Sequence, residues 1–299
     1  MFARVVAVLL VAIGLIAAAP PAPAAAAGPV VMLEFATAPS GRFLPVIRVS
    51  INGSPPLRML ADTGSNILVT FPGALAGVTT PVTNTGVAHT ANYTGTQAIG
   101  TIASATVTVD TSAGAIATTA PVWFLDATSC TPDCLGDGIG ANLDGIFGLS
   151  QGQLTVTDPT VPTDYELFSP LAQLPGASGE GYTVRLGKTD GELELGRPIV
   201  GPSHTVLQQT LAAGAYPTGF SIYEKRVPLC FQVGGVGNCL GTTIDSGEFT
   251  ASLMGTQFAT SPDITLLAHP VHVPGVDITR EGAVNPGVAI GFSLTSGGL

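Results

Sequence analysis

Short segments in which apolar and β-branched residues alternate with polar ones recur along most of the chain. Two clear examples are residues 45–51 (PVIRVSI) and residues 105–109 (ATVTV). Glycine and proline interrupt such segments about every ten residues, which is the pattern of strands joined by turns. Helical periodicity is rare: residues 165–174 form the one fair stretch, with a turn or two around residues 253–258. The sequence therefore predicts a mostly β fold.

The first 27 residues differ in pattern from the rest of the chain. A single arginine near Met1 is followed by an unbroken apolar run over residues 5–19 and then by alanine and proline. Such a run is too short to span a bilayer comfortably, and the small residues after it suit a signal-peptide cleavage site. We expect residues 1–27 to be a secretory signal peptide, with a mature chain that begins near Gly28 and is secreted or held at the cell envelope.

The composition is typical of an exported globular protein. Of 299 residues, 45% are hydrophobic and only 10% are charged, which allows a sizeable core. The net charge of −10 argues against nucleic-acid binding. Because few native ion pairs can be lost when carboxyl groups protonate, we expect the fold to tolerate mildly acidic conditions. We also expect a monomer without a membrane span in its mature form.

Four cysteines in an exported chain suggest two disulfides. Three connectivities are possible, and the spacing favours the local pairs Cys130 with Cys134 and Cys230 with Cys239. A zinc site is the competing interpretation, but neither pair has C-x-x-C spacing and the four histidines do not cluster with the cysteines. We therefore expect neither a metal nor a cofactor.

Two copies of one short motif carry the candidate chemistry. Residues 62–64 (DTG) and 245–247 (DSG) each follow a small apolar run, so each indicates a strand that ends in a tight turn. The two copies suggest a duplicated unit whose halves deliver Asp62 and Asp245 to a shared cleft. Two carboxylates about 3 Å apart repel by about 5 kcal/mol at an effective dielectric of about 20, so the pair retains one proton. One carboxyl is then acid and the other base towards a bound water, which allows peptide hydrolysis without metal or covalent intermediate.

Further segments resemble the pepsin-like aspartic proteases, and the resemblance covers most of the mature chain. Residues 43–62 resemble the opening hairpin of that family, which runs into the first catalytic turn. Residues 93–96 (YTGT) and the strand after them resemble its flap hairpin. Residues 143–149 (LDGIFGL) resemble the apolar-apolar-glycine segment that crosses behind the first catalytic loop and supports it.

The later part of the chain continues the resemblance. Residues 182–186 and 192–196 are similar to paired strands of the inter-lobe sheet, and residues 239–245 to the run from a cysteine into the second catalytic loop. The richness in alanine, glycine and threonine is also similar to the actinobacterial secreted branch of the family. The resemblance implies two pseudo-twofold β-barrel lobes with a cleft between them.

The lobe boundary is expected at the turn near residues 198–202. The resemblance thus implies an N-terminal lobe over residues 28–200, with the first catalytic Asp and the flap, and a C-terminal lobe over residues 201–299, with the second Asp. Because little chain follows the second triplet, we expect the second lobe to be shortened.

The resemblance also assigns roles to individual residues. Asp62 and Asp245 become the catalytic dyad, Gly64 and Gly247 let substrate and water approach, and Tyr93 closes over the substrate. The substrate implied is a protein or peptide in extended conformation, added as a strand across the cleft, with apolar side chains on either side of the cut.

One position departs from the family pattern and two other functions remain as alternatives. Ser65 follows the first triplet as in the family, but Glu248 follows the second, where it either faces the dyad or points to solvent. Glu248 and the short second lobe favour a non-catalytic secreted binding protein. Residues 148–152 (GLSQG) match the nucleophile elbow of serine esterases with Ser150 as nucleophile. That elbow requires a following helix, whereas the residues after it are rich in threonine, valine and proline.

Overall fold

The computed structural model describes residues 28–37, 43–93, 96–134, 143–150, 152–157, 164–176, 181–187 and 190–196 in full, and only the backbone of strands between residues 211 and 294. The predicted signal peptide, the expected lobe boundary near residues 198–202 and the helical turn expected near residues 253–258 lie outside these residues. Within the described part of the chain, no helix is long and apolar enough to cross a membrane.

The protein is mostly β, as predicted, and its main feature is one large mixed sheet of 14 strands. Two short 3-10 helices, η1 (Ala74–Gly77) and η3 (Pro170–Gln173), interrupt it. The strands of the sheet are β1 (Val30–Thr37), β2 (Phe43–Ile51), β3 (Leu57–Asp62), β4 (Leu68–Thr70), β5 (Thr83–Tyr93), β6 (Thr96–Ala105), β7 (Val107–Thr111), β8 (Gly114–Ala117), β9 (Val122–Thr131), β10 (Gly145–Gly148), β11 (Gln153–Thr157), β12 (Asp164–Phe168), β13 (Tyr182–Leu186) and β14 (Gly191–Leu195).

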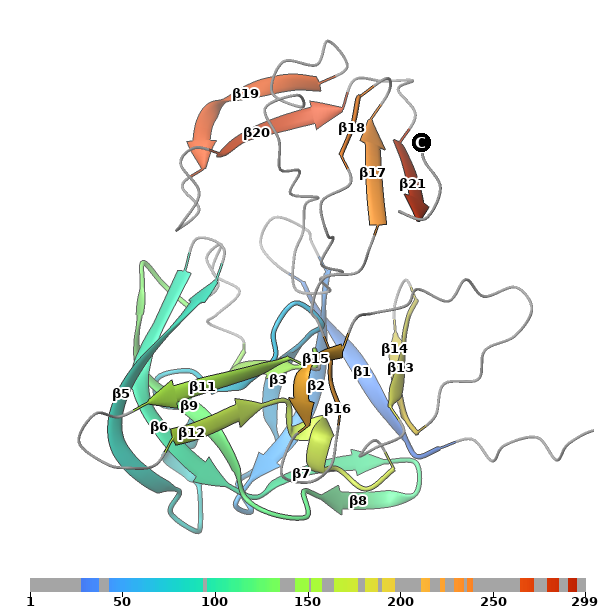
Figure 1. Ribbon diagram of the computed structural model, residues 1–299. Coiled ribbons are helices and arrows are strands. Elements are labelled where there is room, and N and C mark those ends of the chain that lie inside the picture. Colours follow the sequence, from blue (N-terminus) through green and yellow to red (C-terminus); the bar gives the residue numbers. More distant parts are fainter. Residues whose placement is uncertain are drawn as a thin grey trace, which may run out of the picture.

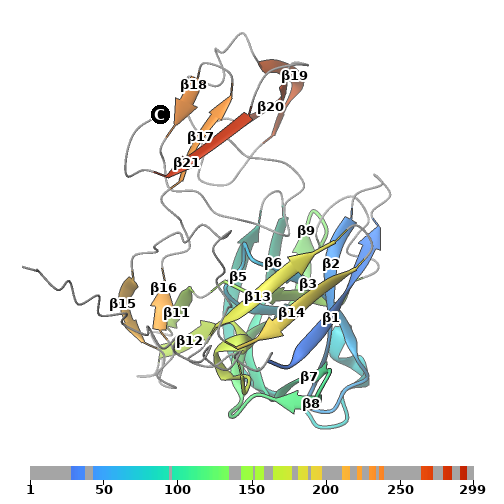
Figure 2. The same cartoon turned by 90° about the vertical axis from the view of Figure 1, so that its right-hand side faces the viewer.

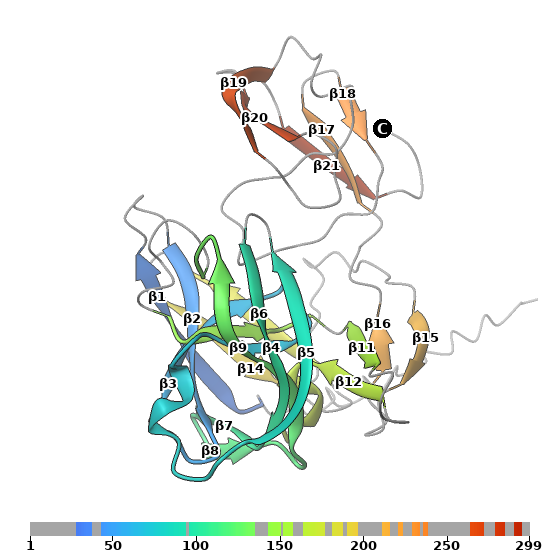
Figure 3. The same cartoon turned by 90° about the vertical axis from the view of Figure 1, so that its left-hand side faces the viewer.

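The strand order brings distant parts of the sequence together. Along the sheet it is β11-β12-β9-β4-β10-β3-β2-β1-β14-β13, with β6 also paired to β9 and β7 to β2 (Figure 1). Figure 2 shows β1, β14 and β13 side by side on one side of the sheet. Figure 3 shows the long β5–β6 hairpin next to β9. In the middle, β10 is parallel to β3 and antiparallel to β4.

The central strands are buried on both faces and separate two hydrophobic cores. Val46 of β2 packs in one core and its neighbour Ile47 in the other. Ile146 and Phe147 of β10 divide between the two cores in the same way, and both are 0% exposed. Because successive side chains of a strand point to opposite faces, strands buried on both sides appear as continuous apolar runs rather than as alternating ones.

Three hairpins expected from the sequence are confirmed. The β2–β3 hairpin turns at Asn52 and Gly53, whose φ angles of 46° and 75° lie in the left-handed region that these two residue types tolerate best. Strands β5 and β6 pair from Tyr93 opposite Thr96. Strands β13 and β14 pair with each other, and β14 pairs with β1.

The helix expected over residues 165–174 is wrong. Strand β12 occupies the first part, with Leu167 beside Trp123 of β9, and the 3-10 helix η3 occupies the second. Pro170 has no N–H to donate within a continuing helix, and Ser169 caps η3 by accepting a hydrogen bond from the amide of Leu171. Pairing with β11 and β9 therefore outweighs a weak helical pattern.

The described strands beyond residue 210 form three smaller sheets. They are β15 (Leu211–Ala215) with β16 (Ser221–Tyr223), β18 (Val236–Asn238) with β17 (Leu229–Val233) and β21 (Ile290–Leu294), and β19 (Ile264–Val271) with β20 (Thr279–Val284). All of these pairs are antiparallel.

Candidate active site

Asp62 is the last residue of β3, and the turn after it orients its carboxylate. The side chain is buried, with 5% of its surface exposed. The amide of Gly64 donates a 2.7 Å hydrogen bond to Oδ1, and the hydroxyl of Ser65 donates to Oδ2. Since both oxygens accept a bond from the same turn, the carboxylate has a fixed orientation before any ligand arrives.

The segment after β10 supports this turn through backbone hydrogen bonds. Gly148 lies opposite Asp62 in the parallel pairing of β10 with β3, and the amide of Leu149 donates a 2.7 Å bond to the carbonyl of Asp62. The amide of Ser150 donates a 2.8 Å bond to the carbonyl of Ser65. The prediction that residues 143–149 lie behind the Asp62 turn is therefore confirmed, while the catalytic role of this turn stays a prediction.

Glycine is needed at position 148 because the backbones approach closely there. A Cβ at Gly148 would lie 2.5 Å from the amide nitrogen of Ile67 and 2.8 Å from the carbonyl oxygen of Ser65. Both neighbours are backbone atoms of the turn, so they cannot move away without moving the turn. The amide of Gly148 also donates a 3.0 Å bond to the carbonyl of Ile67. This glycine thus sets the separation between β10 and the loop of Asp62.

Two side-chain hydroxyls hold the opposite side of the supporting segment. The Ser169 hydroxyl donates a 2.5 Å bond to the carbonyl of Gly148, and the Tyr182 hydroxyl donates a 2.5 Å bond to the carbonyl of Leu149. Ser169 is 2% exposed. Burial raises the pKa of Tyr182 to about 12, so its phenol remains a neutral donor over the whole physiological range. The sequence indicated Tyr182 only as part of a strand.

Tyr93 of the β5–β6 hairpin reaches towards the Asp62 turn. Its hydroxyl is buried, and burial raises the pKa of Tyr93 well above the ordinary tyrosine value. The negative charge of Asp62 raises this pKa further, while contact with the Ser65 hydroxyl opposes the shift. Among the described residues, no group pairs with the Tyr93 hydroxyl at normal hydrogen-bond geometry. The phenol therefore lies beside the candidate carboxylate with an unsatisfied hydrogen-bonding capacity.

The other residues of the predicted site lie outside the described residues. This holds for Asp245, Gly247 and Glu248. The structure brings Asp62, Gly64 and the Tyr93 hydroxyl into one region, and the meeting of the two aspartates stays a prediction.

One of the two expected disulfides is present. Cys130 and Cys134 are bonded at the end of β9, as predicted. Cys239, expected to pair with Cys230, lies outside the described residues.

Ser150 does not have the surroundings of an esterase nucleophile. It is only 8% exposed, and its amide is bound to the Ser65 carbonyl behind the Asp62 turn. The next described element is strand β11, where the elbow would require a helix. The glycine before it, Gly148, serves the close packing described above. The nucleophile-elbow interpretation is therefore wrong.

A second carboxyl, half-buried, was not indicated by the sequence. Asp126 of β9 accepts a 2.9 Å hydrogen bond from the Thr70 hydroxyl of β4. Burial raises the pKa of Asp126, and the bond from Thr70 partly offsets this. The contact between Asp126 and Thr70 depends on the parallel pairing of β4 with β9. No local sequence pattern predicts this pairing.

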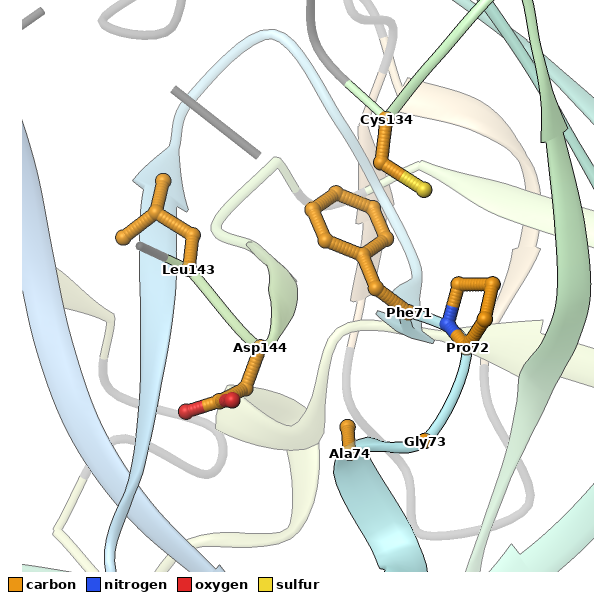
Figure 4. Close-up of a pocket in the computed structure, with 7 residues that line it drawn as sticks. All are labelled: Phe71, Pro72, Gly73, Ala74, Cys134, Leu143 and Asp144. Atoms are coloured by element: carbon orange, nitrogen blue, oxygen red, sulfur yellow. The ribbon is translucent and has the colours of Figure 1, made fainter. Parts of the chain in front are cut away.

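A cavity of about 540 Å³ lies at the other end of β4 and β10 from Asp62 (Figure 4). In the pairing of these strands Gly145 lies opposite Thr70, three positions before Gly148. The carboxylate of Asp144 accepts a 2.7 Å bond from the amide of Arg58. Because its lining residues lie next to the end of β4 and the start of β10, the cavity is separate from the Asp62 turn. Its lining residues are Phe71, Pro72, Gly73, Ala74, Cys134, Leu143 and Asp144.

No protein-family model matches this sequence, and no curated protein is significantly similar to it. The site must therefore be interpreted from its own geometry.

Proposed function

We propose that this protein is an exported aspartic endopeptidase in which Asp62 and Asp245 act together on one water molecule. The observation that carries the proposal is the Asp62 turn: a buried carboxylate at a strand end, bound on both oxygens by Gly64 and Ser65 and backed by a crossing parallel strand. This buried carboxylate accepts hydrogen bonds from neutral donors of its own turn, and buried carboxylates in such surroundings are concentrated at functional sites.

The mechanism requires a second carboxyl opposite Asp62. The Asp245 triplet supplies it in our proposal, and the two carboxyls share one proton. The ionised member removes a proton from water as the water attacks the peptide carbon, while the protonated member donates its proton to the carbonyl oxygen. In the second step the carboxyl that is now protonated donates its proton to the leaving nitrogen, while the ionised one takes a proton from a hydroxyl of the gem-diol intermediate as the C–N bond breaks. The pair then holds one shared proton again.

The proposed architecture is the two-lobed pepsin-like fold. Residues 28–200 would form the lobe with Asp62 and the flap, and residues 201–299 would belong to the second lobe. The long β5–β6 hairpin, with Tyr93 at its turn, supports a flap that closes over an extended peptide. Such a peptide would add as a strand and place apolar side chains on either side of the cut.

The test is cleavage by the full mature chain, purified after export. A denatured protein and a quenched peptide with apolar residues around the cut would be incubated between about pH 3 and pH 7. We expect hydrolysis that a pepstatin-type inhibitor blocks and a serine-directed reagent does not. Complete inertness over this range would instead indicate a non-catalytic binding protein.

A further inference from the structure

We infer that Ser169 and Tyr182 are positioning residues that together hold the strand end behind Asp62, an inference that rests on the proposed function. Neither residue touches the reacting atoms. They act on two consecutive carbonyls, those of Gly148 and Leu149, whose amides are bound to the loop of Asp62.

The hydrogen bonds form a continuous connection. The Tyr182 hydroxyl donates to the carbonyl of Leu149, and the amide of Leu149 donates to the carbonyl of Asp62. In parallel, the Ser169 hydroxyl donates to the carbonyl of Gly148, whose amide donates to the carbonyl of Ile67. The supporting segment is thus held on one side by the loop and on the other side by two hydroxyls.

The two hydroxyls come from elements that are themselves fixed. Ser169 caps η3, whose four residues are all buried. Tyr182 begins β13, the outer strand of the β1–β14–β13 group (Figure 2). The connection therefore transmits the position of this strand group to the turn that carries Asp62.

Position matters more at this site than at an ordinary buried turn. Two carboxyls that share a proton interact strongly only at contact distance, and their coupling decreases as the separation grows. A displacement of the Asp62 backbone should therefore lower turnover without removing any substrate contact. The upper pH limit of activity should also fall, because two carboxyls that interact more weakly lose their shared proton at a lower pH. Tyr93, which faces Asp62, stays neutral over this range because its own pKa is raised.

The experiment compares Tyr182→Phe and Ser169→Ala with a matched control in the full mature chain. Tyr165→Phe is the control: it removes the same hydroxyl from a tyrosine of β12 whose ring packs edge-on against Trp123 with centroids 5.0 Å apart. We expect Tyr182→Phe and Ser169→Ala each to lower kcat by about threefold to tenfold with KM within about twofold. The alkaline limb of the pH profile should move to lower pH in both variants and not in Tyr165→Phe.

Amide hydrogen exchange gives a measurement that does not need activity. In both variants the peptide covering residues 145–150 should exchange about tenfold faster, while the β5–β6 hairpin should keep its protection. If the native chain cleaves nothing, the proposed function fails, and exchange alone decides whether the hydroxyls hold this segment. Unchanged kcat and pH profile in an active protein, or equal acceleration of exchange throughout the sheet, would overturn the inference. If Tyr182→Phe does not fold, Ser169→Ala decides by the same criteria.

Discussion

The amide of Leu149 donates a 2.7 Å hydrogen bond to the carbonyl oxygen of Asp62. This bond extends the parallel pairing of β10 with β3 by one residue, at the point where the chain turns to form the candidate site. The backbone of a central, fully buried strand thus determines where the carboxylate lies. Substitutions that act on the backbone near Gly148 should consequently affect activity as strongly as substitutions of polar side chains.

Asp62→Asn should abolish peptide cleavage and leave the fold intact. The amide side chain keeps an oxygen that can accept the 2.7 Å bond from Gly64, but it cannot take up and release the shared proton. We expect kcat to fall by at least about 1,000-fold. Turnover of a quenched peptide at the optimal pH measures this, and the urea midpoint measures the fold.

The control for this prediction is Asp110→Asn, which changes an exposed carboxyl at the end of β7 in the same way. It should leave turnover unchanged. Asp245→Asn should match Asp62→Asn, since both carboxyls are required in the proposed mechanism. Near-normal turnover in either variant of the pair would contradict the mechanism.

Gly148→Ala should destabilise the protein and reduce its activity together. The new methyl group would lie 2.5 Å and 2.6 Å from the backbone nitrogen and oxygen of Ile67, so β10 and the Asp62 loop must separate. Overpacking of this kind costs about 1–3 kcal/mol. Urea denaturation should show a loss in this range, and kcat should fall because Asp62 moves.

A glycine with space around it provides the comparison. At Gly77 a Cβ would meet only the Pro55 side chain, at 3.5 Å, which is an ordinary contact. Gly77→Ala should change the free energy of unfolding by less than about 0.5 kcal/mol. Equal losses in the two variants would show that the close approach at Gly148 does not govern the site.

The features predicted correctly from the sequence are those encoded locally. The hairpin over residues 43–62 depends on alternating strands and the Asn52-Gly53 turn, and the disulfide between Cys130 and Cys134 on short spacing. Residues 143–149 were placed behind the Asp62 turn from a family resemblance, and the pairing of β10 with β3 agrees with this.

The features missed depend on contacts between distant segments. The bond from Tyr182 to Leu149 and the pair of Asp126 with Thr70 arise only after the sheet has assembled. The helix expected over residues 165–174 failed for the same reason. Its weak periodicity was outweighed by the pairing of Leu167 with Trp123, which no local pattern contains.

Asp126→Asn should stabilise the protein at neutral pH and not in acid. Because burial raises the native pKa of Asp126 above the unfolded value, the native state binds its proton more firmly than the unfolded state does. The stability that this group provides is therefore largest below the ordinary Asp pKa of about 3.9 and decreases as pH rises through the raised pKa. An asparagine avoids this loss and can still accept the bond from Thr70.

The gain at pH 7 should be less than about 1 kcal/mol, because solvent screens a half-buried group. Urea midpoints at pH 7 and pH 3 measure it, with Asp110→Asn as an exposed control that should change neither midpoint. A gain that persists at pH 3 would show that the substitution acts through packing and not through the charge of Asp126.

Tyr182→Phe should destabilise the protein, whereas Tyr93→Phe should not. The Tyr182 hydroxyl makes a 2.5 Å bond to the carbonyl of Leu149, whereas the buried Tyr93 hydroxyl has no partner of normal geometry among the residues that the structure describes. Loss of a paired buried hydroxyl costs about 1–2 kcal/mol, while removal of an unpaired one relieves a desolvation penalty of similar size. The urea midpoint should therefore fall in Tyr182→Phe and stay or rise in Tyr93→Phe.

Activity should nevertheless decrease in both variants. Tyr93→Phe removes the polar group that lies beside Asp62, so a substrate or water would lose a partner there. Tyr182→Phe removes a hydrogen bond that supports the segment behind Asp62. Peptide turnover measured on the same samples as the urea midpoints separates the two effects. A protein that becomes more stable and less active in Tyr93→Phe would indicate that the unpaired hydroxyl is retained for function. A lower midpoint in Tyr93→Phe would instead mean that this hydroxyl has a bonding partner in solution.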